Sequence, residues 1–172
     1  MTRLDGRLRN AANNGEIDTV RRLLAEGASP DAPNADGMTG LQLATRNGHL
    51  DVVAELIAAG ADPFRRERGL QSSLAIASSS GDAETVLALL RSEREPVVGD
   101  LENAVGWAVA FASPETIEIL VEHGADVRAV DPATGRTALD HAQWWCEQAH
   151  PDNRPKFERV LATLRAFASG AG

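Results

Sequence analysis

The chain repeats itself about every 33 residues, and this period limits its fold more than any other feature. AANNG at 11–15 returns as ATRNG at 44–48 and as ASSSG at 77–81. A further step of 31 residues leads to AVAFA at 108–112, and TGRTALDHAQWW at 134–145 matches the front half of the unit again. A fixed period of this length indicates stacked copies of one small structural unit.

Each copy predicts two short antiparallel helices. Thr39 and Thr137 can cap the first helix, because a threonine hydroxyl accepts a hydrogen bond from an unpaired backbone N–H. The second helix of the best copy ends at Gly60, which can adopt a left-handed backbone. One such pair cannot bury its apolar sides alone, so neighbouring pairs must stack. We therefore predict an all-α array within a single domain, 1–172, with units at about 4–33, 34–66, 67–97, 98–130 and 131–168.

The pattern resembles the ankyrin repeat family, most fully in DGMTGLQLATRNGHLDVVAELIAAGADP at 36–63. The resemblance covers roughly residues 4–168, and the motif is specific. It implies an ankyrin-repeat solenoid of about five helix–turn–helix units, in a short stand-alone array of the bacterial type. It also implies a concave face of inner helices and projecting hairpins, with which family members hold other proteins.

The chain departs from the family pattern in every unit. The family's Thr-Pro-Leu-His becomes TGLQ at 39–42, SSLA at 72–75, NAVG at 103–106 and TALD at 137–140. Without the proline and the bracing histidine, we expect weaker helix starts and weaker hydrogen bonds between repeats, in an unchanged fold. The third unit lacks the Gly-Ala-Asp stop, which predicts an irregular hairpin over 92–99.

The last two units differ in other ways. Ser113 is expected to cap a helix that has Pro114 in its first turn. A turn-rich insertion at 150–155 precedes a closing helix predicted at about 156–168.

The resemblance also suggests which residues touch a partner, since the family's recognition residues lie at hairpin tips and just before the inter-helix turn. The positions in the second to fifth units are Met38, Arg46 and Asn47; Gln71, Ser79 and Ser80; Glu102, Ala110 and Phe111; and Arg136, Trp144 and Trp145.

Phe111, Trp144 and Trp145 are expected to form an aromatic anchor, because such residues often dominate binding energy. Helix geometry is expected to send one tryptophan of the adjacent pair inward and the other outward. An end cap of the array is the other interpretation of this pair, and Trp107 is expected to pack in the core.

Charge narrows the class of partner. The formal net charge is −8 and the pI is near 5.0, which argues against nucleic acid because few cations are present to neutralise phosphates. Residues 99–130 hold six acidic residues against Arg128 alone. Two interpretations remain open: a solubilising surface, or a surface that attracts a basic partner.

The sequence offers little for chemistry. One cysteine, Cys146, permits neither an internal disulfide nor a multi-cysteine metal site. Asp140, His141 and Cys146 resemble a nucleophilic set only on paper, because adjacent helical residues point apart. No glycine-rich phosphate loop stands out. We therefore predict no catalytic residue, no metal and no cofactor, and do not expect an enzyme.

Apolar runs long enough for a signal peptide or a membrane span are missing from the sequence. This favours a soluble, cytoplasmic protein that does not bind membranes and is a monomer or weak dimer.

Three functions compete. We favour a protein-binding module whose concave face holds a partner, as an inhibitor or regulator of a basic protein. A second interpretation is a small-molecule binder or unusual enzyme with an aromatic groove near Trp107, Phe111 and Trp144. A third is an oligomerising domain that pairs through apolar residues at its ends.

Overall fold

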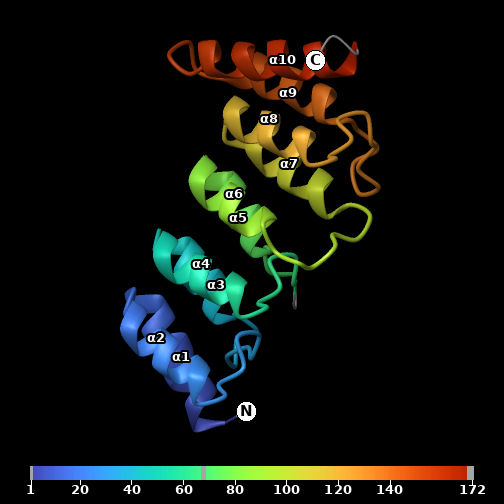
Figure 1. The fold of residues 1–172 in the computed structure, drawn as a ribbon. Helices are drawn as coiled ribbons and strands as arrows, with labels where there is room; N and C mark the ends of the chain where they lie inside the picture. The colour runs from blue at the N-terminus through green and yellow to red at the C-terminus, as the bar shows by residue number, and fades with distance from the viewer. Residues whose placement is uncertain (1, 67–68, 170–172) are drawn as a thin grey trace. The chain divides into compact units, whose positions relative to one another are not determined.

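Helices are the only regular secondary structure in residues 2–66 and 69–169, which the computed structural model describes (Figure 1). These residues form ten helices: α1 (Arg3–Asn14), α2 (Ile17–Ala25), α3 (Gly40–Arg46), α4 (Leu50–Ala58), α5 (Ser73–Ser80), α6 (Ala83–Leu90), α7 (Asp100–Ala110), α8 (Pro114–Glu122), α9 (Ala138–Gln148) and α10 (Arg154–Ala168). The predicted all-α array of helix pairs is confirmed. The predicted start of the third unit, at residue 67, lies outside the described residues. None of the described helices is long and apolar enough to cross a membrane.

The chain divides into two compact units, which we call unit 1 (Met1–Ala77 and Glu84–Glu95) and unit 2 (Ser78–Ala83 and Pro96–Gly172). Within unit 1, α1 packs against α2 and α3, and α4 packs against α2 and α3. Within unit 2, α7 packs against α8 and α9, and α10 packs against α8 and α9. In both units, first helices contact first helices and second helices contact second helices, as stacked repeats require.

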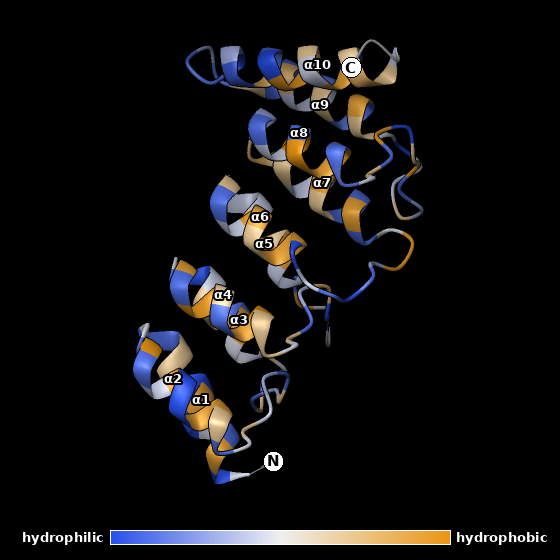
Figure 2. Cartoon of the chain, viewed as in Figure 1, coloured by the Kyte–Doolittle hydropathy of each residue, from blue (hydrophilic) through white to orange (hydrophobic). Residues whose placement is uncertain are grey.

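The core of each unit consists mainly of leucine, isoleucine, valine and alanine side chains. Figure 2 colours the apolar residues of the helices orange. Large core residues with almost no exposed surface include Leu8, Leu23, Leu41, Leu56 and Leu89 in unit 1 and Ile117, Leu120 and Leu164 in unit 2. Fully buried alanines, such as Ala12, Ala44 and Ala142, allow close approach of neighbouring helices.

Reciprocal capping boxes start three of the first helices. Thr39 Oγ1 accepts a bond from the Gln42 N–H at 3.3 Å, and Gln42 Oε1 accepts one from the Thr39 N–H at 2.8 Å. Thr137 and Asp140 form the same box at α9, so both predicted caps are confirmed. Thr2 and Asp5 form a third box at α1, which the repeat pattern does not predict. These bonds replace the fixed backbone angle that the missing proline would supply.

Gln42 also links consecutive repeats. Its Nε2 donates to the carbonyl oxygen of Gln71 at 2.8 Å, so the inter-repeat bonding that we expected to be weak is present here. Arg9, at the corresponding position of the first repeat, donates from its guanidinium to the Ala32 carbonyl oxygen at 3.1 Å. A glutamine and an arginine therefore stand where the family uses histidine.

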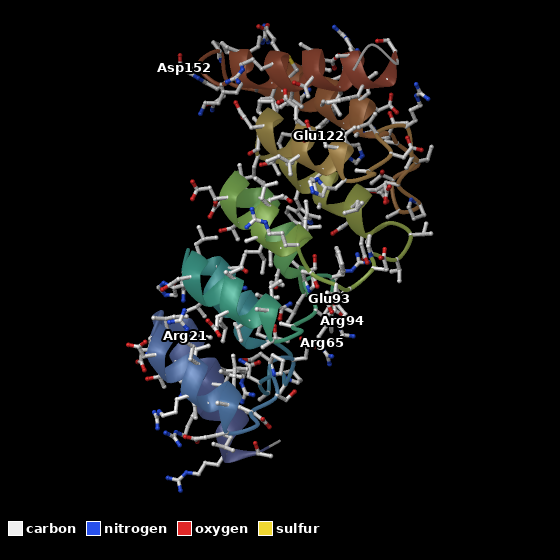
Figure 3. All side chains as sticks on the ribbon, viewed as in Figure 1. Arg21, Arg65, Glu93, Arg94, Glu122 and Asp152 are labelled. Atoms are coloured by element: carbon white, nitrogen blue, oxygen red, sulfur yellow. The ribbon has the colours of Figure 1, made fainter. Side chains whose placement is uncertain are left out.

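The hairpins of unit 1 are joined by polar contacts. Asp31 Oδ1 accepts a bond from the Asp62 N–H at 2.8 Å. Arg94, labelled in Figure 3, donates to the Gly60 carbonyl at 3.3 Å and lies 3.7 Å from the Asp31 carboxylate. Residues 92–99 contain neither helix nor strand, which confirms the predicted irregular hairpin.

The fourth repeat, over about 98–130, differs in detail from the prediction. Helix α7 begins at Asp100, one turn before the NAVG segment, because Gly99 takes a left-handed φ of 93° and Asp100 accepts a bond from the Val97 N–H. Ser113 does occupy the N-cap of α8, with Pro114 in the first turn, but its side chain makes no capping bond. The closing helix also begins two residues earlier than expected, at Arg154.

Candidate interaction surface

In unit 1, Arg46 and Asn47 lie exposed at the end of α3, where the chain turns towards α4. The Asn47 side chain donates from Nδ2 to the backbone oxygen of Asn13 at 2.8 Å and to its side-chain oxygen at 3.1 Å. Asn47 therefore ties the second repeat to the first, while Arg46 extends the exposed edge of this turn.

The other two predicted residues of unit 1 are less accessible. Met38 is only 9% exposed, and its backbone is bonded to Asn34 in both directions. Gln71 is half-buried, and its carbonyl oxygen is the acceptor for Gln42. Met38 lies in the core because the turn at Asn34 folds it inward, so it offers a partner little area.

In unit 2, the predicted polar residues lie in different settings. Ser79 is half-buried and Ser80 is exposed, both in the last turn of α5, and Arg136 is exposed just before the cap of α9. Glu102 lies in the first turn of α7 rather than in a hairpin, and its Oε1 accepts a bond from the Asp126 N–H at 3.0 Å. Glu102 therefore braces the next hairpin. Ala110 is half-buried at the end of α7.

The aromatic residues of the predicted anchor are exposed. Phe111 has 57% of its surface exposed, Trp144 has 43% and Trp145 has 37%. These are high fractions for large apolar side chains, which normally gain about 1.5–3 kcal/mol from full burial. An exposed apolar group of this kind is informative when it is large, because polar side chains could have occupied the same positions.

Ring contacts divide the aromatics into two clusters. The rings of Trp107 and Phe111 are stacked with their centroids 6.2 Å apart. Trp145 stacks on Phe157 of α10 at 6.1 Å and meets Trp144 edge-on at 4.9 Å. Among the described residues, no ring contact joins Phe111 to the tryptophans of α9, so the predicted anchor consists of two separate sets of rings on one unit.

The expectation that one tryptophan of the pair points inward is wrong, because both are partly exposed. Trp145 lies against α10 at the side of α9 and is covered only in part, so it both closes the unit and remains accessible. Trp107, predicted to lie in the core, is half-buried with its ring against Phe111.

The turn that follows Phe111 is strained. Ala112 has a φ of 56°, and among the described residues it alone has a positive φ without being a glycine. The corresponding positions of the first three repeats are Gly15, Gly48 and Gly81, with φ of 73°, 73° and 70°. A Cβ atom in this region clashes with the backbone.

Replacing Ala112 with glycine is therefore expected to stabilise the protein, by about 0.5–1 kcal/mol in the free energy of unfolding. Chemical denaturation would measure the change. Ala110→Gly, two residues earlier and helical, is the matched control and should cost about 1 kcal/mol instead. A lower stability of Ala112→Gly would contradict this description of the turn.

Part of the acidic charge of unit 2 is already balanced. Glu115 of α8 lies 2.6 Å from Arg159 of α10. Its own backbone N–H and then Arg159 hold the pKa of Glu115 below its ordinary value. Glu118 and Glu122 remain exposed on the same helix; Glu122 is labelled in Figure 3. Glu115 is therefore paired within unit 2, whereas Glu118 and Glu122 present their carboxylates at its surface.

The three residues weighed as a nucleophilic set have separate roles. Asp140 accepts bonds from Thr137, whose backbone N–H and hydroxyl lower the pKa of that carboxyl. His141 Nε2 lies 3.1 Å from Thr134 Oγ1, and Cys146 is half-buried one turn further along α9. Across the described residues, no three His, Cys, Asp or Glu side chains come together as a metal site.

No residue of the hairpin over 92–99 is among the predicted partner contacts, although Val97 and Val98 are highly exposed there. The sequence feature that marks this hairpin is the missing Gly-Ala-Asp stop. That feature predicts an irregular backbone, but it does not show which side chains face solvent.

A comparison with protein families finds that the model for ankyrin repeats (3 copies) matches residues 8–100, more than half of the chain. A comparison with curated proteins finds no match. Both units show the pairing of helices that the repeat requires. The caps at Thr39 and Thr137 and the left-handed Gly15, Gly48 and Gly81 lie at corresponding positions of the repeat. The chain belongs to the ankyrin repeat family.

Proposed function

We propose that this chain binds a basic partner protein, as its inhibitor or regulator, and that the exposed aromatic residues of unit 2 anchor the partner. Ankyrin repeats are generally protein–protein interaction modules. The observation that carries the proposal is the exposure of Phe111, Trp144 and Trp145, three of the chain's seven aromatic residues. Large, rigid aromatic side chains supply much contact area at a low cost in conformational entropy.

Charge supports the choice of a basic partner. The chain has a formal net charge of −8, and Glu118 and Glu122 are exposed on the unit that carries the aromatics. Opposite charge on two proteins speeds their association and is screened by salt. We therefore expect the association rate to fall as ionic strength rises.

Substitution of the anchor tests the proposal. A partner recovered by affinity purification would be produced pure and titrated with each variant by calorimetry. Phe111→Ala and Trp144→Ala should each raise the dissociation constant about ten-fold or more, as expected for aromatic residues at the centre of an interface.

Leu87→Ala is the control, because Leu87 is a large, exposed apolar residue on α6 in unit 1. It should bind as the unchanged chain does. Unaltered affinity of both aromatic variants, with intact helical content, would overturn the proposed anchor. Trp145→Ala is a poorer probe, since Trp145 also packs on Phe157.

A further inference from the structure

The outer face of α9 carries one tryptophan among acidic and amide side chains. Positions spaced by three, four and seven residues lie on one side of a helix. The exposed residues with this spacing are Asp140, Gln143, Trp144, Glu147 and Gln148. Trp144 thus has a carboxylate one turn before it and another one turn after it.

The position of the Trp144 ring is defined by its neighbour. Trp145 meets Trp144 edge-on, with an interplanar angle of 76°, and is itself stacked on Phe157 of α10. A chain of ring contacts therefore runs from the closing helix to the surface. Trp144 is held at the surface while 43% of it remains exposed.

The exposed carboxylates on this face belong to α9 itself. Helix α9 contains Asp140 and Glu147 but neither lysine nor arginine. Both bonds that the Asp140 carboxylate accepts from Thr137 end on Oδ2, and Glu147 Oε1 has a long contact of 3.4 Å with Gln143 Nε2. Arg136, before the helix, and His141 also act on Asp140, and both lower the pKa of its carboxyl. Glu147 lies two turns from Asp140, at the other end of the face.

We propose that Trp144, Asp140 and Glu147 form a receptor for an arginine side chain of the partner protein. The inference rests on the proposed function and adds the chemistry that the partner must present. A guanidinium is planar, so it can stack on the indole face while its N–H groups donate to carboxylates beside the ring. A lysine ammonium offers charge without the planar stack, and a neutral side chain offers neither.

Short peptides test this receptor without the partner. The probes are acetyl-Gly-Arg-Gly-amide and the same peptide with lysine or with citrulline, the neutral isostere of arginine. The indole ¹⁵N–H signals of the three tryptophans are followed by NMR, and Trp144→Phe assigns the Trp144 signal. The slope is the change in the Trp144 chemical shift per unit of peptide concentration. We expect this slope to be ~2- to 5-fold steeper with the arginine peptide than with the citrulline peptide. Lysine should lie between them.

Charge variants complete the test. Glu147→Gln should reduce the arginine slope about two-fold. Glu84→Gln, which removes an exposed carboxylate from α6, should leave it unchanged. Asp140 is not substituted, because it also caps α9. Equal slopes for arginine and citrulline, or no change in Glu147→Gln, would overturn the receptor.

The peptide experiment and the titration with the partner can fail independently of each other. If Trp144→Ala lost the partner but the peptides showed no preference for arginine, the anchor would stand and the arginine receptor would fall. If both experiments failed, the protein-binding role of this surface would fall with it.

Discussion

Leu89→Ala should lower the free energy of unfolding by about 2–5 kcal/mol, which is the usual cost of removing a fully buried leucine side chain. Leu89 lies on α6 with no exposed surface, among the apolar side chains that unit 1 buries between its helices. A single helix pair has no core of its own, so a cavity at this position weakens the stacking of neighbours. Urea denaturation followed by circular dichroism gives the change directly.

The control for this substitution lies on the same helix. Leu87 is two residues away and 37% exposed, so Leu87→Ala removes the same atoms with less loss of buried area. We expect it to cost less than about 1 kcal/mol. Equal destabilisation by the two substitutions would mean that α6 does not bury one side against its neighbours.

Gly15→Ala should destabilise the protein by about 2–3 kcal/mol, the sum of a backbone term and a lost hydrogen bond. Gly15 has a φ of 73°, and a Cβ atom there would lie 2.7 Å from Nδ1 of His49. The His49 ring cannot move freely, because its Nε2 lies 3.1 Å from the Asn13 carbonyl oxygen. The thermal midpoint and the denaturation free energy would report the loss.

Gly48→Ala separates the two terms. Gly48 has the same φ of 73°, but a Cβ atom there meets nothing within 4 Å. It should cost about 1 kcal/mol, from the backbone alone. In a His49→Ala background, Gly15→Ala should fall to the same value. If Gly15→Ala and Gly48→Ala cost the same with His49 in place, then His49 does not pack against Gly15 as described.

Repetition made the helix pairs predictable. Thr39, Thr137 and Gly60 each combine a residue type with a repeated position. As expected, the two threonines cap the starts of helices and Gly60 follows the end of one. Local chemistry is enough at such points, because a hydroxyl cap or a left-handed glycine acts within a few residues of the chain.

Contacts between residues far apart in the sequence were harder to predict. Gln42 bonds to Gln71 and Arg9 to Ala32 across more than twenty residues, and neither Gln42 nor Arg9 matches the family's histidine. The early start of α7 also depends on a contact outside the motif, between Asp100 and Val97. Such bonds depend on side-chain reach once the helices have stacked, which sequence spacing does not reveal.

The surface was predictable by position but not by exposure. Phe111 and Trp144 lie exposed where the family pattern placed recognition residues, whereas Met38 is buried and Glu102 braces a hairpin. Neighbours decide between these outcomes: Asn34 draws Met38 inward, and Trp145 on Phe157 holds Trp144 at the surface. The acidic face around Trp144 became visible only when the exposed side of α9 was known.

Hydroxyl-radical footprinting of the chain, alone and with its partner bound, tests the central claim most directly, because it reports the solvent exposure of individual side chains. We expect labelling of Phe111 and Trp144 to fall sharply in the complex, while labelling of Leu87 stays as it is in the free chain. Undiminished labelling of both aromatic residues in a saturated complex would contradict the account, since the partner would then leave the exposed rings of unit 2 uncovered.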